Sequence, residues 1–236
     1  MPFVRVIFIT GTDTGVGKSL ITALLLRHLR DNGHSAFAIK PFCTGNRADA
    51  KLLHALQNGD LDLHEINPFY FSEPVAPLVA ARKHRRPISL SQVLGHISNL
   101  QQNLANESQP ATILIEGAGG LLVPLGKDYT WAKVIQKLRC EVILVSANRL
   151  GTINHTLLTH RVLQAADIQT LTVLLMDVLS PRHVTPDTRH NARILAEFLP
   201  STPLLEIPFL GPNACSPKAV KKNAKKIKKV LARILA

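Results

Sequence analysis

The sequence is poor in cysteine and in long apolar runs. Its three cysteines, Cys43, Cys140 and Cys215, show neither a paired disulfide spacing nor a metal-ligand spacing. We therefore expect a chain without disulfides or zinc, as in a reducing compartment. No segment approaches the roughly 18 uninterrupted apolar residues of a membrane span. The apolar run at residues 3–9 also lacks the cleavage region of a signal peptide. These absences predict a soluble, cytoplasmic protein.

Acidic residues are missing from the C-terminal segment, residues 216–236. This segment carries eight of the Lys and Arg residues, which leaves only +4 of the formal charge of +12 for the rest of the chain. Its apolar residues recur at steps of four and three, and so predict a basic amphipathic helix with one apolar stripe, made of Val220, Ala224, Ile227, Leu231 and Ile234. Such a helix could lie on an anionic membrane or touch nucleic acid. We favour a helix docked by its stripe, because the chain shows no nucleic-acid module.

Length and composition predict a single domain over residues 1–236, since 236 residues with 46% hydrophobic content can bury one substantial core. Strand-like runs alternate with helical patterns along the chain. The strand-like runs are residues 4–10, 36–40, 112–116, 142–146, 171–176 and 204–207. The helical patterns are residues 18–32, 48–57, 90–105, 131–138, 154–166 and 188–198.

Several of the strand-like runs are apolar throughout, as is typical of strands covered on both faces. Repeated strand-then-helix units predict an α/β fold with a doubly wound, mainly parallel sheet flanked by helices. In such a fold the ligands bind at the carboxyl ends of the strands. Ser89 and Asp187 are expected to cap two of the helices. Residues 60–88, rich in proline and aromatics, are expected to form an ordered excursion from the alternating pattern.

The stretch "TGTDTGVGKS" follows the first strand-like run and predicts a phosphate-binding loop (P-loop). Its glycines allow backbone N–H groups to point at phosphate oxygens, and the next helix adds its free N–H groups and its dipole. The lysine would neutralise the β- and γ-phosphates, and the serine hydroxyl would ligate Mg²⁺. Five residues, rather than the usual four, separate Gly11 from Gly17. The residues expected to bind nucleotide here are Thr14, Gly15, Val16, Gly17, Lys18, Ser19 and Leu20.

Two acidic residues are candidates to complete a Mg²⁺ site with Ser19. Glu116 ends the strand-like run of "TILIEGAGG", just before a flexible run whose Gly117, Ala118 and Gly119 would lie against the nucleotide. Asp49 opens the helical pattern of "RADAKLL". Hard oxygen ligands suit Mg²⁺. Alternatively, Glu116 ends its strand as a cap, and Asp49 is an acid at a helix start.

The stretch "AIKPFCTG" places Lys40 at the end of the second strand-like run, at the same sheet edge as the P-loop. A turn shaped by Pro41 and Gly45 would present Lys40 and Thr44 to a ligand. A lysine at a strand end is otherwise an ordinary solvated charge.

In "RLGTINHTLLT", a helix start follows a strand, so the N–H groups of Gly151, Thr152, Ile153 and Asn154 are candidates for a second anion site. Asn154 could equally act as a simple N-cap. Two anion sites suggest a nucleotide and an anionic co-substrate.

Together these stretches resemble one family, the ATP-dependent dethiobiotin synthetases, P-loop NTPases that close the ureido ring in biotin synthesis. The resemblance extends over most of the chain. It runs in order through "GTDTGVGKS", "KPFCTG", "NPFYFSEPVAP", "RPIS", "EGAGGLLVPL", "RLGTINHTLLT" and "EIPFL".

The resemblance implies a reaction. One amine of 7,8-diaminononanoate takes up CO₂, the carbamate attacks the γ-phosphate of ATP, and the second amine closes the ring and expels phosphate. Lys18 and Lys40 match the family's active-site lysines, and its metal ligands match Ser19, Asp49 and Glu116. Thr44 falls near the substrate amines. The stretch from Gly151 to Asn154 would bind the substrate's carboxylate from the neighbouring subunit, which implies a homodimer.

The chain departs from this family at two positions near the nucleotide base. Met176 stands where the family commonly has an asparagine that reads the base, and Gly211 and Pro212 stand where a glutamate contacts the nucleotide. A thioether cannot make the paired hydrogen bonds of an amide, so we expect weak base selectivity. The nucleotide contacts expected in this region are Met176, Asp177, Ile207, Pro208 and Phe209.

A rival interpretation is a partition or division-site ATPase switch, which shares the fold and the P-loop. Those switches carry an additional lysine near the start of the loop, where this chain has Thr10, Gly11 and Thr12. "KPFCTG" and "GTINH" have no obvious role in a switch. The synthetase interpretation is therefore preferred.

Overall fold

The computed structural model describes residues 3–106, 109–178, 180 and 186–235. A six-stranded sheet forms its centre, in the order β10-β9-β8-β1-β5-β2, and all neighbouring strands pair in parallel. The predicted fold class is confirmed. The strands are β1 (Val4–Gly11), β2 (Ser35–Ile39), β5 (Ala111–Glu116), β8 (Glu141–Ala147), β9 (Thr170–Met176) and β10 (Leu204–Ile207).

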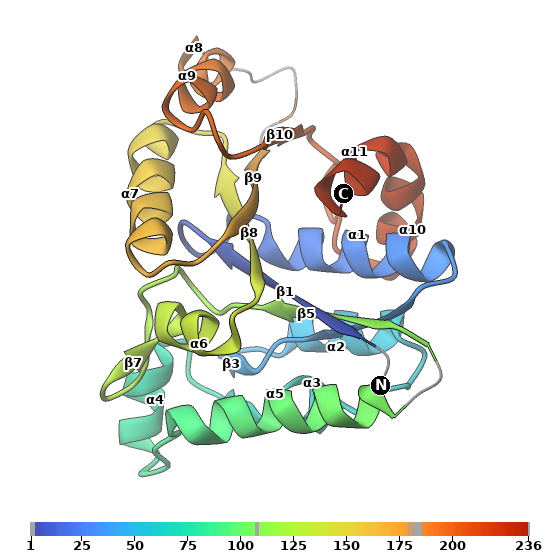
Figure 1. Cartoon of the computed structure of the whole chain (residues 1–236), viewed down its shortest axis with the longest axis vertical. Coiled ribbons are helices and arrows are strands. Elements are labelled where there is room, and N and C mark those ends of the chain that lie inside the picture. Colours follow the sequence, from blue (N-terminus) through green and yellow to red (C-terminus); the bar gives the residue numbers. More distant parts are fainter. Residues whose placement is uncertain (1–2, 107–108, 179, 181–185, 236) are drawn as a thin grey trace.

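Helices cover both faces of the sheet. Figure 1 shows α1 and α5 on opposite sides of β1 and β5, with α7 beside β8 and β9. The helices are α1 (Lys18–Asp31), α2 (Ala48–Leu56), α3 (Leu63–Ile66), α4 (Pro77–Lys83), α5 (Leu90–Ala105), α6 (Trp131–Leu138), α7 (Thr152–Ala165), α8 (Pro186–Arg189), α9 (Asn191–Phe198), α10 (Pro217–Lys226) and α11 (Lys228–Leu235).

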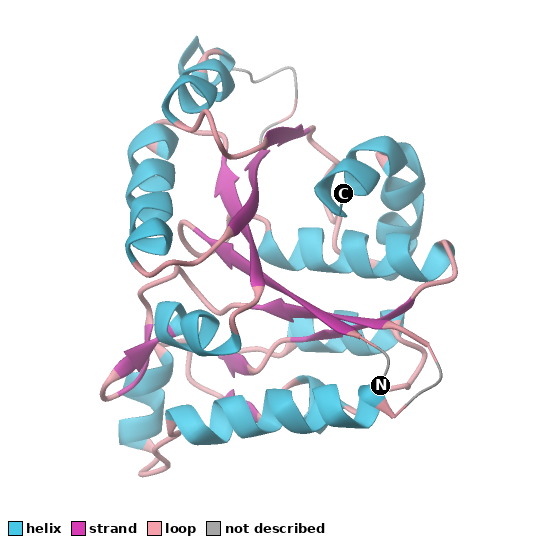
Figure 2. Cartoon of the chain, in the orientation of Figure 1, coloured by secondary structure: helices cyan, strands magenta, loops and turns pink. Residues whose placement is uncertain are grey.

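Two further pairs of short strands lie outside the main sheet (Figure 2). β3 (Phe42–Thr44) pairs in parallel with β4 (Phe69–Phe71), and β6 (Pro124–Gly126) pairs antiparallel with β7 (Tyr129–Thr130). With α3, β4 and α4, the excursion at residues 60–88 is ordered as expected. The sequence patterns did not reveal β3, β4, β6 or β7, because strands of two or three residues carry no detectable period.

The core lies on both faces of β1. Ile7, Phe8 and Ile9 are fully buried, as expected for a strand that is apolar throughout. Phe8 packs against Trp131 with ring centroids 5.1 Å apart, and Trp131 meets Phe42 at 5.6 Å in an edge-to-face arrangement. These contacts connect the strand before the P-loop to α6 and, through Phe42, to β3, and so hold the elements around the site together.

Two predicted helix starts were wrong. α7 begins at Thr152 instead of Asn154, because Gly151, with φ of 88°, adopts the left-handed conformation before the helix. The helix expected at residues 188–198 is two helices, and Asp187 lies inside α8, which starts at Pro186. Proline suits the first turn of a helix. The predicted cap at Ser89 is confirmed, with a capping box to Gln92.

The single helix expected at residues 216–236 is also wrong. The segment forms two helices, α10 and α11, separated at Ile227, whose backbone leaves the helical conformation. The break lets α10 pack on α1 while α11 reaches both α1 and β10. All five residues of the apolar stripe are buried, at 5% exposure or less: Val220, Ala224, Ile227, Leu231 and Ile234. The segment is therefore docked by its stripe.

Within the described ranges, none of the helices combines the length and apolarity needed to cross a lipid bilayer.

Candidate active site

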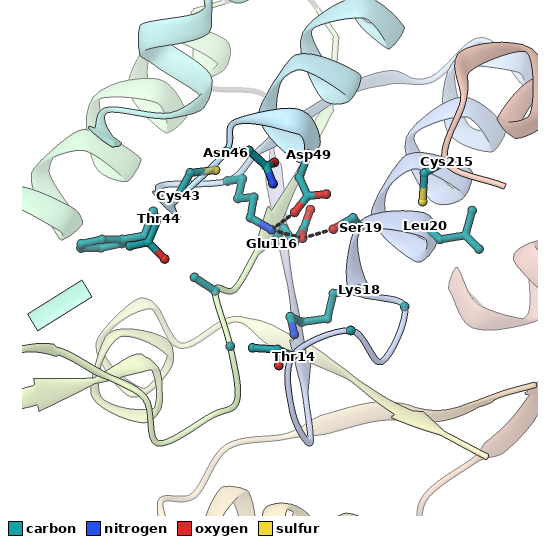
Figure 3. A pocket seen from close by; sticks show the side chains of 16 residues that line it. Thr14, Lys18, Ser19, Leu20, Cys43, Thr44, Asn46, Asp49, Glu116 and Cys215 are labelled. Atoms are coloured by element: carbon teal, nitrogen blue, oxygen red, sulfur yellow. Dashed lines mark hydrogen bonds and ion pairs between the residues drawn. The ribbon is translucent and has the colours of Figure 1, made fainter. Parts of the chain in front are cut away.

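The loops after β1, β2 and β5 surround one cavity of ≈ 430 Å³ at the carboxyl edge of the sheet (Figure 3). This position follows from the strand order, because β5 lies between β1 and β2 and all three run in parallel. The cavity is lined by Thr14, Gly15, Gly17, Lys18, Ser19, Leu20, Lys40, Phe42, Cys43, Thr44, Asn46, Asp49, Glu116, Ala118, Gly119 and Cys215.

The P-loop has the backbone of an anion cradle. Gly15 and Gly17 adopt positive φ angles of 69° and 106°, which favour glycine, and Gly17 is the N-cap of α1. The first N–H groups of α1 therefore face the cavity end of the helix without a side-chain cap. The Lys18 side chain folds back over the loop, and its Nζ donates to the carbonyl of Asp13 at 2.7 Å. The loop can thus surround phosphate with donors and one cation.

Lys40 forms the centre of a charged cluster. Its Nζ donates to Asp49 Oδ2 and to Glu116 Oε1, both at 2.5 Å, and Ser19 Oγ donates to the same Glu116 oxygen at 2.6 Å (Figure 3). Lys40 is 7% exposed and Glu116 is fully buried. A buried charge requires such partners, because removal from water is costly. The residues predicted from four separate stretches of sequence therefore meet in one cluster.

The surroundings shift the pKa values of these groups in opposite directions. Burial alone would lower the pKa of Lys40, but the carboxylates of Glu116 and Asp49 outweigh it and raise this pKa above its ordinary value. Burial would raise the pKa of Asp49, but the Lys40 ammonium holds it below its ordinary value. For Lys18 burial prevails and lowers the pKa to about 8, although Glu116 opposes the shift. The positive charge of Lys18 is thus less well balanced by neighbouring carboxylates than that of Lys40.

The oxygen atoms of this cluster fit a Mg²⁺ ion. Glu116 Oε2 is buried and has no hydrogen-bond partner among the described residues. An orphaned carboxylate oxygen is costly unless something binds it. The Ser19 hydroxyl and the Asp49 carboxylate lie beside Glu116, so the donors are all hard oxygens. Mg²⁺ binds such ligands and completes its shell with water and phosphate.

The glycine run after β5 lies against the P-loop. The N–H of Gly117 donates to the carbonyl of Ile9 at 3.0 Å, and a Cβ on Gly120 would lie 3.4 Å from the carbonyl of Thr12. Trp131 Nε1 donates to the carbonyl of Ala118 at 2.9 Å and fixes the run from the other side. The glycine run, which forms part of the cavity wall, is therefore held by hydrogen bonds to β1 on one side and to α6 on the other.

The residues expected near the nucleotide base do not line this cavity. Met176 is 4% exposed, and its Cε would lie 3.0 Å from a Cβ on Gly17, so the thioether supports the P-loop. Asp177 Oδ1 accepts from Asn148 Nδ2 at 2.8 Å, and Asn148 Oδ1 accepts from Asn191 Nδ2 at 2.9 Å. Ile207, Pro208 and Phe209 lie at the end of β10, where the carbonyl of Ile207 accepts from the N–H of Asp177 at 2.9 Å.

The predicted second anion site also lies outside the cavity. Gly151, Thr152, Ile153 and Asn154 form the start of α7, and no side chain caps this helix. The Thr152 hydroxyl lies 2.7 Å from the Ser146 hydroxyl at the end of β8. The N–H of Thr152 already donates to the carbonyl of Arg149 at 3.1 Å, so an anion at this helix start would meet the N–H groups of Ile153 and Asn154.

Sequence reasoning missed four residues that line the cavity: Phe42, Cys43, Asn46 and Cys215. The first three stand in or next to "KPFCTG", so the stretch itself was a signal. Burial raises the pKa of the Cys43 thiol to about 11, which keeps it protonated. Cys215 is exposed and reaches the cavity from the loop after β10, a return of the chain that no local pattern indicates.

The fold and the site define a P-loop nucleotide-binding protein. A family model described as "AAA domain" matches residues 5–213. Among solved structures, the chain is similar to the septum site-determining protein MinD complexed with Mg-ADP from Pyrococcus horikoshii, with a TM-score of 0.56, 18% identity and coverage of 98% and 99% of the two chains. It is also similar to a ParA family ATPase from Chlorobium tepidum, with a TM-score of 0.57, 13% identity and coverage of 99% and 98%. These structures show the fold alone.

Sequence relatives identify the family of the chain more specifically than these structures do. The chain is 35% identical to ATP-dependent dethiobiotin synthetase BioD of Anaeromyxobacter dehalogenans, over 87% of this chain and 90% of the relative. It is 38% identical to the enzyme of the same name from Bacillus subtilis, over 66% and 67%. The identity is 37% with that from Methanocaldococcus jannaschii, over 65% and 71%. The chain belongs to the ATP-dependent dethiobiotin synthetase family.

Proposed function

We propose that this chain is a cytoplasmic dethiobiotin synthetase, a ligase that uses Mg-ATP to carboxylate 7,8-diaminononanoate and close its ureido ring. The observation that supports the proposal best is the meeting of Lys18 and Lys40 on the wall of one cavity. Both side chains are buried to 7% exposure or less, and one of them is held between two carboxylates. Two anions, a carbamate and a triphosphate, need such fixed cations to approach each other.

The reaction has three steps. An amine of the substrate adds to CO₂ and loses a proton, which gives a carbamate. A carbamate oxygen then attacks the γ-phosphorus of ATP, ADP leaves, and a carbamic–phosphoric anhydride forms. The second amine attacks the carbonyl carbon, inorganic phosphate leaves, and the five-membered urea closes with loss of a proton. Each step is favoured by correct placement of the reactants.

Lys18 and Lys40 have different roles in these steps. Lys18 follows the P-loop glycines, so its ammonium group is placed to neutralise the transferred phosphate. Lys40 and Thr44 line the cavity from the second strand's side, where the carbamate would lie. The charged state of Lys40 is secured by Glu116 and Asp49. Its ammonium group can therefore hold the carbamate while it attacks phosphorus.

Ser19, Asp49 and Glu116 would hold Mg²⁺. A bound Mg²⁺ neutralises phosphate charge and orients the γ-phosphate. The buried Glu116 Oε2, which no described residue satisfies, supports this assignment.

We further propose that the enzyme is a homodimer. Leu122 and Leu150 are 56% and 81% exposed, although they are large and apolar. Both stand beside loops that flank the P-loop: Leu122 follows the glycine run, and Arg149, next to Leu150, contacts Asp13 at 3.5 Å. A second subunit on this rim would cover both leucines and bring its own α7 start, with the stretch from Gly151 to Asn154, toward the substrate's carboxylate.

One assay tests the proposed reaction. The purified chain is supplied with 7,8-diaminononanoate, ¹³C-bicarbonate and Mg-ATP, and the products are followed by mass spectrometry. We expect dethiobiotin with one ¹³C atom, with one phosphate released per product. Phosphate release that is independent of the diamine would instead indicate a nucleotide-driven switch and reject the synthetase assignment.

A further inference from the structure

A second hollow, which none of the proposed chemistry uses, lies between α1 and the two C-terminal helices. Its volume is ≈ 320 Å³, and Figure 1 shows α10 and α11 packed beside α1. We call it the basic groove. None of its residues lines the candidate active site. The lining residues are Arg27, His28, Asp31, Asn32, Lys221, Ala224, Lys225 and Lys228.

The basic groove carries uncompensated positive charge. Its one acid, Asp31, is already paired with Arg27 through contacts of 2.5 Å and 2.9 Å. Lys221, Lys225 and Lys228 are exposed, and their ammonium groups have no hydrogen bond or ion pair with another described residue. Three cations therefore surround a concave space without an acid to balance them.

Docking of the C-terminal segment does not require these three lysines. The buried apolar stripe makes that contact, and Val220 and Leu231, on the two helices, are fully buried. Lysines four residues apart on one helix, such as Lys221 and Lys225, repel each other. The stripe also leaves no apolar face for insertion into a bilayer. A concave, cationic surface without a free apolar face fits a small polyanion better than a flat lipid surface.

We propose that the basic groove binds a compact anion with two or more phosphate groups, such as inorganic pyrophosphate or a nucleotide diphosphate. Two phosphate groups carry about three to four negative charges at neutral pH, which matches three unpaired lysines. The volume suffices, since it equals that of about ten water molecules in the liquid. His28 and Asn32 also line the groove, and the Asn32 Nδ2 group donates to the carbonyl of His28 at 2.6 Å.

The test uses the full chain, with His28 as a local reporter. Inorganic pyrophosphate is added, and the ¹H–¹³C imidazole signals of His28 and the amide signals of Lys221, Ala224 and Lys225 are followed by NMR. These signals report the groove separately from the active site. We expect a saturable shift that weakens as salt is added. ADP in a parallel titration separates the sources: an equal shift includes nucleotides among the ligands, and no shift restricts the groove to inorganic pyrophosphate.

Two variants with the same change in charge make the test specific. K221Q/K225Q/K228Q removes the groove lysines, and K222Q/K226Q/K229Q removes three exposed lysines of the same helices that do not line the groove. Glutamine keeps the helix propensity of lysine, so both variants should fold. We expect the first to weaken pyrophosphate binding about tenfold or more and the second to weaken it less than about threefold.

Three outcomes would overturn the proposal. These are no shift of the groove signals at any pyrophosphate concentration, an equal loss of affinity in both variants, and a lower melting temperature of the first variant with unchanged binding. The last result would give these lysines a role in stability instead of anion binding, as for Lys225 in the last turn of α10, where a cation stabilises the helix dipole.

Discussion

The lysines of the active site and those of the C-terminal helices carry the same charge in opposite surroundings. Lys18 and Lys40 are 6% and 7% exposed and contact the P-loop carbonyl or two carboxylates. The lysines of α10 and α11 are exposed and form no ion pair with other described residues. Most of the net charge therefore lies where each lysine contributes little to stability, whereas the proposed chemistry depends on two buried lysines with fixed partners.

The largest expected effect follows from removal of a buried lysine. Lys40→Ala removes the cation between Asp49 and Glu116, so we expect a loss of kcat of about 10³-fold or more with largely unchanged ATP affinity. Lys18→Ala should lower both kcat and ATP affinity. The matched control is Lys222→Ala, an exposed lysine of α10, which should retain full activity. Steady-state rates and calorimetric ATP titrations measure both quantities, and near-normal turnover of Lys40→Ala would refute the assigned role.

The second largest effect concerns the docking of the C-terminal helices, which carry the exposed lysines. Leu231 belongs to the buried stripe of α11, so Leu231→Ala should lower the free energy of unfolding by about 2–5 kcal/mol. Lys229→Ala, on the same helix but exposed, should change it by less than about 0.5 kcal/mol. Urea denaturation measures the difference. Equal, small effects of both substitutions would show that the C-terminal helices are not docked in solution.

The sequence predicted the sheet, the P-loop and the edge at which the site lies, because alternating elements and glycine spacing are local features. It did not predict that Lys40 would contact Glu116 directly. That contact depends on β2 pairing with β5, and strand order is a property of the whole fold. For the same reason it missed Cys215, which reaches the cavity only because the chain returns after β10.

The errors at helix ends also have physical causes. The apolar period near Gly151 is compatible with a helix that begins at Thr152 or at Asn154. The positive φ of Gly151 decides that α7 begins at Thr152. The break at Ile227 cannot be seen in the apolar stripe, which continues across it. It arises from tertiary packing, because α10 and α11 contact different partners. Packing of this kind overrides local propensity.

A smaller effect is expected from pH. The pKa of Lys18 is lowered by burial to about 8, whereas its ordinary value is 10.5. ATP favours the charged form, so the affinity for ATP should fall as pH rises above about 8, by up to about tenfold per pH unit. Lys18→Arg stays charged and should show a flat profile between pH 7 and 9.5. Titration calorimetry across this range measures it, and a flat wild-type profile would show that Lys18 keeps its proton.

The lowered pKa of Lys18 also makes the stability of the fold depend on pH, but stability rises with pH where ATP affinity falls. Between pH 8 and 10.5 the unfolded chain binds more protons at Lys18 than the folded chain, so this group's contribution to stability rises with pH. Lys40, whose pKa is raised, contributes fully below its ordinary value and loses the contribution only above it.

The smallest expected effect concerns how strongly the enzyme discriminates between nucleotide bases. Met176 is buried under the P-loop and offers no paired hydrogen bonds, and the loss of such a contact removes about 1–3 kcal/mol of discrimination. We therefore expect kcat/KM for ATP, GTP, CTP and UTP to agree within about tenfold. A preference for ATP above about 100-fold would show that other residues read the base, with Asp177 and the backbone at residues 207–209 as the first candidates.

The central claim is that buried cations at the ends of β1 and β2 bring a carbamate to the terminal phosphate of ATP. A crystal structure with 7,8-diaminononanoate, bicarbonate and a nonhydrolysable ATP analogue tests it directly. We expect a carbamate oxygen within about 3.5 Å of the γ-phosphorus and in hydrogen-bond contact with Lys40 Nζ. A diamine bound away from the P-loop, or with both nitrogens turned from the γ-phosphate, would contradict it.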